Sequence, residues 1–239
     1  MGMSGRALRT VLEGIKKPNG MILTSGPTGS GKSTTLYSIL NALNSSERKI
    51  ITLEDPIEYG IAGISQIPIA TNDGGSFAEG LRSVLRLDPD VVMVGEIRDA
   101  DTAKTAIQAS ITGHLVLSSF HANTTSAAFA RMIDLIGVNP VFSTSVRLLI
   151  AQRLVRKLDN HKEAYKADEN TKNYIKRVLA NVKTDYNLDD ITLYRAVPNE
   201  ENPFGYKGRV AIIRAQNDVV QGIGQHHAQI TFRLGTSGK

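Results

Sequence analysis

The stretch that decides the fold is Gly26-Pro27-Thr28-Gly29-Ser30-Gly31-Lys32-Ser33, which matches the pattern G-x-x-x-x-G-K-[ST]. An apolar run at Met21–Ser25 precedes it, and Lys32–Asn44 follows with apolar residues at helical spacing. Glycines allow the backbone to turn successive N–H groups inward around an anion, and the start of the helix adds its positive dipole end. The order strand, loop, helix is the context in which this pattern binds phosphate.

The loop also predicts which residues contact a bound nucleotide. Lys32 is expected to neutralise the β- and γ-phosphates, and the Ser33 hydroxyl is expected to ligate Mg²⁺. The predicted cofactor is therefore Mg²⁺ together with ATP. The predicted nucleotide-binding residues are Gly26, Pro27, Thr28, Gly29, Ser30, Gly31, Lys32, Ser33 and Thr34.

Short apolar runs alternate with longer helical patterns in the first part of the chain. The predicted strands are Met21–Ser25, Lys49–Glu54, Val91–Gly95 and Leu115–Phe120, and the predicted helices are Lys32–Asn44, a helix from a Ser76 cap to about Leu87, and about Asp101–Thr112. Such alternation is typical of a mainly parallel sheet flanked by helices. We therefore predict an α/β fold, with a P-loop core domain at residues 1–140.

The pattern changes after Pro140. Val141–Leu158 predicts one long helix, and Thr171–Val182 predicts another. Arg209–Arg214 could form a short returning strand, whereas residues 215–239 give no consistent pattern. We therefore predict a small helical C-terminal subdomain at residues 141–239.

Two acidic residues follow predicted strands at their carboxyl ends. Glu96 comes directly after Val91–Gly95, and Glu54 ends Lys49–Glu54. Parallel sheets present their ligand crevice at this edge, so both carboxylates could converge on one γ-phosphate. Glu96 is expected to hold Mg²⁺ through water, but the spacing leaves open which acid is the general base.

Histidines and arginines supply further candidates near these strands. His121 lies at the carboxyl end of Leu115–Phe120 and is a candidate catalytic residue that senses the γ-phosphate, whereas His114 at the opposite end is expected to be structural. Arg82, Arg86 and Arg98 could neutralise phosphate in the same or an adjacent subunit, although a surface position is the default for each.

Composition excludes some classes of protein. The 239 residues contain no cysteine, so disulfides and thiolate metal sites are excluded. A net charge of +5 allows an anionic partner, but aromatic residues are only 5% and tryptophan is absent, which disfavours a surface that stacks nucleic-acid bases. Apolar runs are far shorter than the roughly 20 residues that cross a bilayer, so any membrane association is expected to be peripheral.

Four sequence blocks together resemble the secretion ATPases of type II secretion and type IV pilus assembly systems. They are the loop Gly26–Ser33, the aspartate box Ile51–Glu58, the run Leu81–Asp90 that leads to Gly95–Asp99, and the histidine box Thr112–His121. The match continues through Ala151–Arg156 and returns at Gly205–Val210.

This resemblance implies a RecA-like ATPase core that works as a homo-oligomer, usually a hexameric ring. It implies a place at the cytoplasmic face of the cell membrane, where an inner-membrane platform protein of a pilus or secretion machine is the partner. The block Ala151–Arg156 is more similar to the assembly and secretion branch than to the retraction branch.

The chain departs from the family pattern in three places. Family members of this branch often hold zinc with four cysteines, but Asp159 and Pro198–Asn202 lie where such cysteines would be, so no zinc is expected. The family's N-terminal domain, which supplies arginines to the nucleotide, is not in this sequence. The tail after Arg214 does not follow the family pattern.

The sequence therefore predicts an ATP-hydrolysing motor subunit that powers pilus assembly or protein secretion. Two other functions remain open at this point: a RecA-like nucleic-acid translocase, and a non-catalytic scaffold whose shape responds to ATP. No nucleic-acid partner is expected, because of the low aromatic content.

Overall fold

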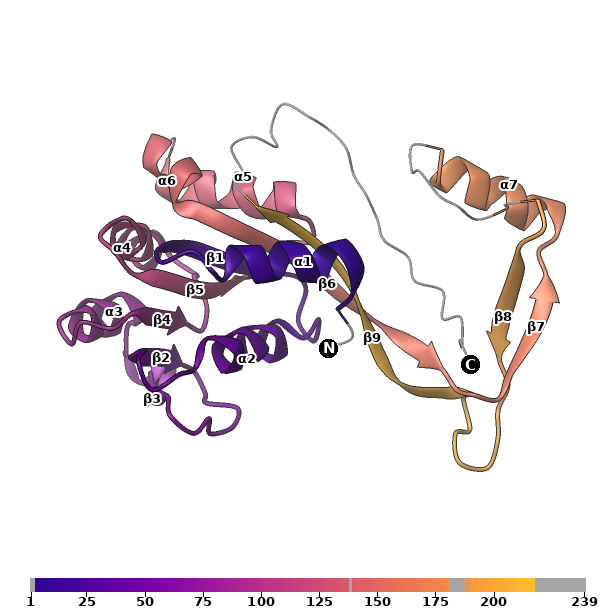
Figure 1. Ribbon diagram of the computed structural model, residues 1–239, viewed down its shortest axis with the longest axis horizontal. Coiled ribbons are helices and arrows are strands. Elements are labelled where there is room, and N and C mark those ends of the chain that lie inside the picture. The colour runs from indigo at the N-terminus through magenta and orange to yellow at the C-terminus, as the bar shows by residue number, and fades with distance from the viewer. Residues whose placement is uncertain (1–2, 138, 181–186, 188, 218–239) are drawn as a thin grey trace. The chain divides into compact units, whose positions relative to one another are not determined.

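The computed structural model describes residues 3–137, 139–180, 187 and 189–217 (Figure 1). Its contacts divide the chain into two compact units. Of the described residues, those up to Arg153 and Ile213–Asn217 belong to the first unit, and those within Leu154–Ile212 belong to the second. This division by contacts falls after Arg153. The domain boundary that the sequence predicts after residue 140 stays a prediction. Within the described residues, no helix is long and apolar enough to cross a membrane.

The first unit contains a sheet of order β3-β2-β4-β5-β1-β6-β9, to which β6 contributes its residues up to Arg153 and β9 its residues from Ile213. Its strands are β1 Gly20–Ser25, β2 Ile50–Glu54, β3 Ser65–Pro68, β4 Val91–Val94, β5 Leu115–Phe120, β6 Val146–Leu158 and β9 Tyr206–Asn217. The pairs from β3 through to β6 are all parallel. This sheet confirms the predicted α/β class and the four predicted strands.

Helices cover both faces of this sheet (Figure 1). They are α1 Gly5–Gly14, α2 Lys32–Leu43, α3 Phe77–Leu85, α4 Ala100–Ile111, α5 Thr125–Ile136 and α6 Pro140–Ser145. Along β1, Met21 and Leu23 belong to the core under α3, α4, α5 and α6, whereas Ile22 belongs to the core under α1 and α2. Successive strand side chains point to opposite faces, so a strand with apolar residues at every position is covered on both sides.

Side-chain caps fix the start of two helices that border the site. The Ser76 hydroxyl accepts a hydrogen bond from Glu79 N at the start of α3, as predicted. The Asp99 carboxylate accepts one from Thr102 N, 2.8 Å away, at the start of α4. These caps satisfy backbone donors that have no partner within the helix, and they set where the loops after β3 and β4 end.

The long helix predicted over Val141–Leu158 is wrong. The short helix α6 ends at Ser145, and Val146–Leu158 forms β6, which pairs with β1 in parallel. An apolar run such as Leu148–Ala151 has the same appearance in a buried helix and in a central strand. Here the strand is favoured because β6 lies between β1 and β9, and consecutive residues Leu148–Gln152 of its first half are buried.

The second unit contains a strand pair and one helix among its described residues. Strands β7 Lys162–Lys166 and β8 Thr192–Ala196 pair antiparallel, and α7 spans Glu169–Val178. Helix α7 confirms the described part of the helix predicted at Thr171–Val182, and the strand predicted at Arg209–Arg214 lies within β9. The expected helical subdomain is therefore a mixture of strands and a helix, and residues 218–239 of it lie outside the described residues.

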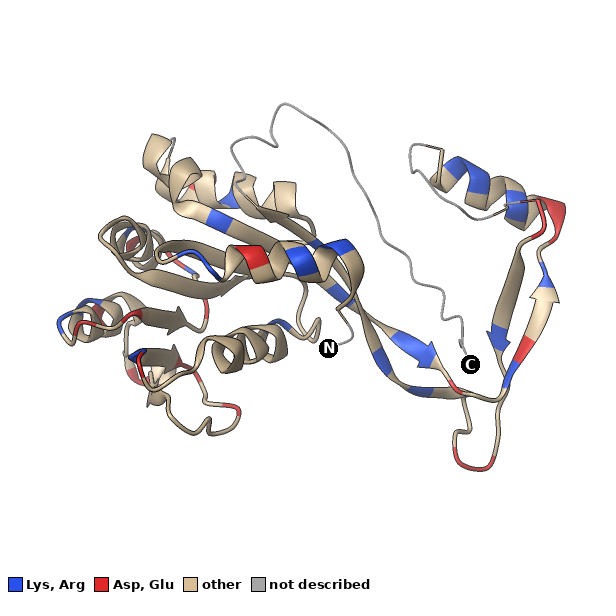
Figure 2. Cartoon of the chain, in the orientation of Figure 1, with Lys and Arg blue, Asp and Glu red and all other residues tan. Residues whose placement is uncertain are grey.

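Figure 2 shows where the charged side chains lie on the helices and strands. Lysines and arginines follow one another along β6 and β9, and cations of the second unit pair with acids. The pairs include Lys166 with Asp190 at 2.6 Å and Arg195 with Glu163 at 2.6 Å. Asp159 is buried and accepts hydrogen bonds from the amides of Asn199 and Asn202, which hold its pKa below the ordinary value.

Candidate nucleotide site

The predicted phosphate-binding loop connects β1 to α2 and contains the glycines that its shape requires. Gly29 and Gly31 have φ values of 74° and 85°, in the left-handed region that favours glycine. A Cβ on Gly26 would lie 2.4 Å from both Gln152 O and Ser30 Oγ. Only glycine therefore fits at Gly26, because the neighbouring backbone cannot move away.

Lys32 lies at the first turn of α2 and folds back onto the loop. Its Nζ donates to Gly26 O at 3.1 Å and to Pro27 O at 3.3 Å. Burial lowers the pKa of Lys32, and the nearby charge of Glu96 opposes that shift. The ammonium group thus contacts the first two residues of the loop and interacts electrostatically with Glu96.

The remaining predicted loop residues differ in exposure. Ser30 is buried, whereas Pro27, Thr28 and Gly29 at the tip are exposed. Ser33 and Thr34 are exposed on the first turn of α2. The hydroxyls of these two residues are therefore accessible to a ligand that lies at the positive end of the helix.

Glu96 and His121 are brought together at the carboxyl ends of neighbouring strands. Strands β4 and β5 pair in parallel up to Val94 and Ser118, so the residues that follow them emerge at the same edge. His121 Nε2 lies 3.0 Å from Glu96 Oε1, and Arg98 Nε lies 2.7 Å from Glu96 Oε2. The Glu96 carboxylate is 16% exposed and has a partner on each oxygen.

Glu54 ends the next strand, β2, and belongs to a separate hydrogen-bond cluster. It is buried, with 4% of its surface exposed. Thr52 Oγ1 and Gln66 Nε2 donate to its Oε1 at 2.6 and 3.0 Å, and Tyr37 OH donates to its Oε2. Burial, followed by the hydrogen bond to Glu54, raises the pKa of Tyr37 to about 12.

The cluster around Glu54 ties α2 to the segment that follows β2. Tyr37 lies on α2, and its hydroxyl also accepts a hydrogen bond from Glu58 N at 3.3 Å. Gln66 Oε1 accepts from Ile61 N at 2.7 Å. Both oxygens of Glu54 are thus occupied by neutral donors that hold neighbouring backbone in place.

The other sequence candidates have varied surroundings. Arg82 pairs with Asp101 at 2.7 Å, and Arg86 is exposed. His114 lies at the opposite end of β5, where its Nδ1 is 3.1 Å from Ala109 O, and its structural role stays a prediction. Of the three candidate arginines, Arg98 is the one that pairs with Glu96 among the described contacts.

Two residues of the site were missed by the sequence reasoning. Arg131 on α5 donates to His121 O at 3.3 Å and lies over the Phe120 ring at 5.7 Å. Gln152 on β6 contacts the phosphate-binding loop at Ser30 O through its Nε2, and it contacts Thr35 on α2 through its Oε1. Nothing in the local sequence signalled Gln152, because the helix predicted there hid the strand that carries it.

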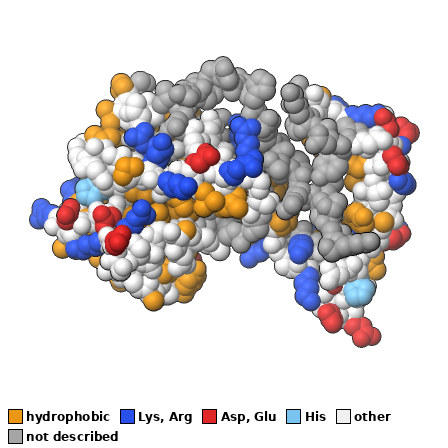
Figure 3. Space-filling view, viewed as in Figure 1, with side chains coloured by type: hydrophobic (Ala, Val, Ile, Leu, Met, Phe, Trp, Pro, Cys, Tyr) orange, Lys and Arg blue, Asp and Glu red, His pale blue; other side chains and the backbone are white. Residues whose placement is uncertain are grey.

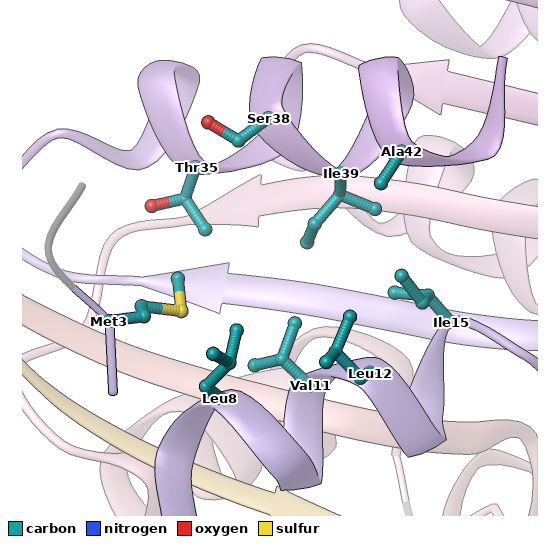
Figure 4. Close-up of a pocket in the computed structure, with 9 residues that line it drawn as sticks. All are labelled: Met3, Leu8, Val11, Leu12, Ile15, Thr35, Ser38, Ile39 and Ala42. Atoms are coloured by element: carbon teal, nitrogen blue, oxygen red, sulfur yellow. The ribbon is translucent and has the colours of Figure 1, made fainter. Parts of the chain in front are cut away.

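A separate groove of about 300 Å³ lies between α1 and α2. Figure 3 shows hydrophobic side chains at the surface in this region, and Figure 4 shows α1 and α2 presenting them to each other. Its lining residues are Met3, Leu8, Val11, Leu12, Ile15, Thr35, Ser38, Ile39 and Ala42. None of these lining side chains is ionisable.

A glycine-rich loop between a buried strand and a helix, with acids at neighbouring strand ends, defines the class of P-loop nucleotide-binding proteins with a RecA-like core. The family model described as "Type II/IV secretion system protein" matches residues 1–230. The chain belongs to this family.

Relatives and solved structures agree with this membership. The chain is 51% identical over 201 residues to the type II secretion system ATPase E of Vibrio cholerae, covering 83% of this chain and 38% of that protein. It is 52% identical over 171 residues to the type II secretion system protein E of Pseudomonas aeruginosa, covering 71% and 34%. The chain thus spans about a third of the length of these relatives.

Two crystal structures share the fold. The pilus retraction motor PilT with bound ADP has a TM-score of 0.60 and 40% identity, over 67% of this chain and 48% of that one. The ATPase DotB of Legionella pneumophila has a TM-score of 0.57 and 31% identity, over 65% and 45%.

Proposed function

We propose that this chain is the ATP-hydrolysing part of a motor subunit for type II-like protein secretion or type IV pilus assembly. The observation that carries the proposal is the phosphate-binding loop Gly26–Ser33, with the paired Glu96 and His121 at neighbouring strand ends. The similarity to the type II secretion system ATPase E of Vibrio cholerae supports ATP hydrolysis in a secretion system.

Nucleotide binding would use the loop and the first turn of α2. Lys32 would exchange the carbonyl oxygens of Gly26 and Pro27 for phosphate oxygens, which carry more negative charge. The exposed hydroxyls of Ser33 and Thr34 would contact the phosphates or the metal ion that accompanies them.

The oxygen donors at the site fit Mg²⁺. The Ser33 hydroxyl and the Glu96 carboxylate are hard oxygen ligands, which Mg²⁺ prefers, with the carboxylate acting through water. When bound, the ion neutralises charge on the β- and γ-phosphates.

Glu96 is the best supported carboxylate for the chemical step. It lies within the electrostatic reach of Lys32, and its partner His121 can hold it in one orientation. His121 could also contact the γ-phosphate, as a sensor would. Glu54 acts in this proposal by fixing α2 through Tyr37, because both of its oxygens are occupied by neutral donors.

The assembly proposed from the family is a homo-oligomer, a hexameric ring at the cytoplasmic face of the cell membrane. Its partner would be an inner-membrane platform protein of the secretion or pilus machine. Arg82, Arg86 and Arg98 are exposed and could serve a nucleotide in their own or an adjacent subunit.

Steady-state release of phosphate from MgATP tests the proposed activity. The 239-residue chain should release phosphate only when Mg²⁺ is present, and Lys32→Ala should abolish MgATP binding and turnover together. Lys17→Ala, at an exposed position after α1, is the control for loss of a lysine. A chain that binds MgATP without turnover would support the scaffold instead, and strong salt-sensitive stimulation by DNA would support a translocase.

A further inference from the structure

We propose that Gln152 is a positioning residue of the phosphate-binding loop, which fixes the Ser30–Gly31 peptide so that its N–H faces a bound phosphate. This inference rests on the proposed function, because it concerns how the same loop is held. Gln152 lies on β6, on the strand that the sequence predicted to be helical.

Strand register places Gln152 against the loop. The parallel pairing of β1 with β6 ends with Ser25 opposite Ala151. The next residue on β1's side is Gly26, the first of the loop, and the next on β6 is Gln152. The two residues accordingly lie so close that a Cβ atom on Gly26 would be only 2.4 Å from the backbone oxygen of Gln152.

The side chain of Gln152 spans the loop from inside the fold. It is 2% exposed, its Nε2 donates to Ser30 O at 2.6 Å, and its Oε1 accepts from Thr35 Oγ1 at 2.6 Å. A carbonyl oxygen can only accept a hydrogen bond, so the amide must turn its NH₂ group towards Ser30. One side chain thus connects the last turn of the loop to the first turn of α2.

The hydrogen bond to Ser30 also sets the direction of a backbone donor. The peptide between Ser30 and Gly31 is trans, so its C=O and N–H point in opposite directions. Because Gln152 holds the Ser30 carbonyl towards the core, the Gly31 N–H is directed away from it. Gly31 has a left-handed φ of 85°, which leaves this peptide without the steric restraint that a side chain would impose. The amide of Gln152 supplies the missing restraint.

Substitutions at Gln152 separate positioning from packing. Gln152→Met keeps the length and the apolar stem but has no amide, and Gln152→Glu has the same shape but sets a carboxylate oxygen against Ser30 O. Both should weaken binding of fluorescent MgADP by about tenfold or more, with the larger loss for Gln152→Glu. Gln108→Glu, on the exposed surface of α4, makes the same chemical change away from the loop and should bind as the unsubstituted chain does.

Two further measurements test whether the loss of binding lies at the phosphates and depends on the contact between Gln152 and Thr35. Inorganic pyrophosphate has neither base nor ribose, so it reports on the phosphate contacts alone. Its inhibition constant, measured by competition with fluorescent MgADP, should rise about tenfold in the Gln152 variants. Thr35→Val removes the hydroxyl that donates to Gln152 and should weaken binding, whereas Thr35→Ser should restore it. These variants serve if the Gln152 variants do not fold.

The outcomes distinguish this inference from the proposed function. If the unsubstituted chain binds MgADP and Gln152→Met binds within twofold of it, the positioning role is wrong and the function stands. Equal binding by Thr35→Val and Thr35→Ser overturns the role in the same way. If the unsubstituted chain itself does not bind MgADP, the proposed function and the inference both fail.

Discussion

Glu54 ends β2 and Glu96 follows the end of the neighbouring parallel strand β4 by two residues, yet their surroundings differ. Glu54 is buried, and neutral groups of Tyr37, Thr52 and Gln66 donate to its two oxygens. Glu96 is partly exposed, and its partners are the ionisable side chains of Arg98 and His121. The same residue type, near the ends of neighbouring strands, is therefore held in two different ways.

The difference indicates a division of roles. Releasing Glu54 would leave buried donors without partners, and each such loss costs about 1–3 kcal/mol. Releasing Glu96 would break contacts at a partly exposed position, where water can replace them at little cost. Glu96 is thus the acid that can turn towards a nucleotide, whereas Glu54 holds α2 in place.

The largest effect is expected for Glu96→Gln. The variant should bind MgATP as the unsubstituted chain does but lose about 10²- to 10³-fold in turnover, since the amide cannot supply the charge that the chemical step needs. Single-turnover phosphate release, with binding measured separately, checks this. Normal release by Glu96→Gln would refute the role given to Glu96.

A smaller effect on turnover is expected for Glu54→Gln. We expect about a tenfold loss, or about 1.4 kcal/mol of barrier, because the amide NH₂ must face donors of the cluster and α2 is held less firmly. Denaturant unfolding should show a loss of about 1–3 kcal/mol in parallel. A loss of turnover as large as that of Glu96→Gln, with unchanged stability, would exchange the two roles.

The pH dependence of the unfolding free energy, compared between the unsubstituted chain and Tyr37→Phe, tests the hydrogen-bond cluster around Glu54. The pKa of Tyr37 is raised to about 12 in the folded chain, against 10.0 ordinarily. Its contribution to stability is therefore fully present below pH 10 and is lost as the pH rises towards about 12, because the unfolded chain loses the proton first. The unsubstituted chain should lose about 3 kcal/mol more than Tyr37→Phe over this interval. Parallel curves of unfolding free energy would contradict the cluster as described.

The smallest effect is expected for Arg98→Ala. Its ion pair with Glu96 is 2.7 Å long, but the arginine side chain is 57% exposed. Thermal unfolding should change by less than about 1 kcal/mol, and the difference should shrink in high salt. A loss above about 3 kcal/mol would show that Glu96 is held as firmly as Glu54.

The sequence predicted best what depends on local pattern. The loop, its flanking β1 and α2, and the strands β2 and β4 that precede the two acids were predicted because each carries its own motif or apolar run. The Ser76 cap was predicted for the same reason, since capping is a local property.

What the sequence could not predict depends on partners distant in the chain. Strand β6 was interpreted as a helix because its apolar run fits either structure, and only its place beside β1 decides between them. The contact of Gln152 with Ser30 joins residues 122 positions apart. Likewise, the difference between Glu54 and Glu96 follows from Tyr37 and Gln66, which no strand-end pattern includes.

A crystal structure of the chain with Mg²⁺ and a slowly hydrolysed ATP analogue tests the central claim most directly. The account predicts the triphosphate in the loop Gly26–Ser33, Glu96 turned from Arg98 to within one water of the metal ion, and Glu54 still bound by Tyr37, Thr52 and Gln66. A structure in which Glu54 leaves these donors to reach the γ-phosphate, while Glu96 stays with Arg98, would contradict it.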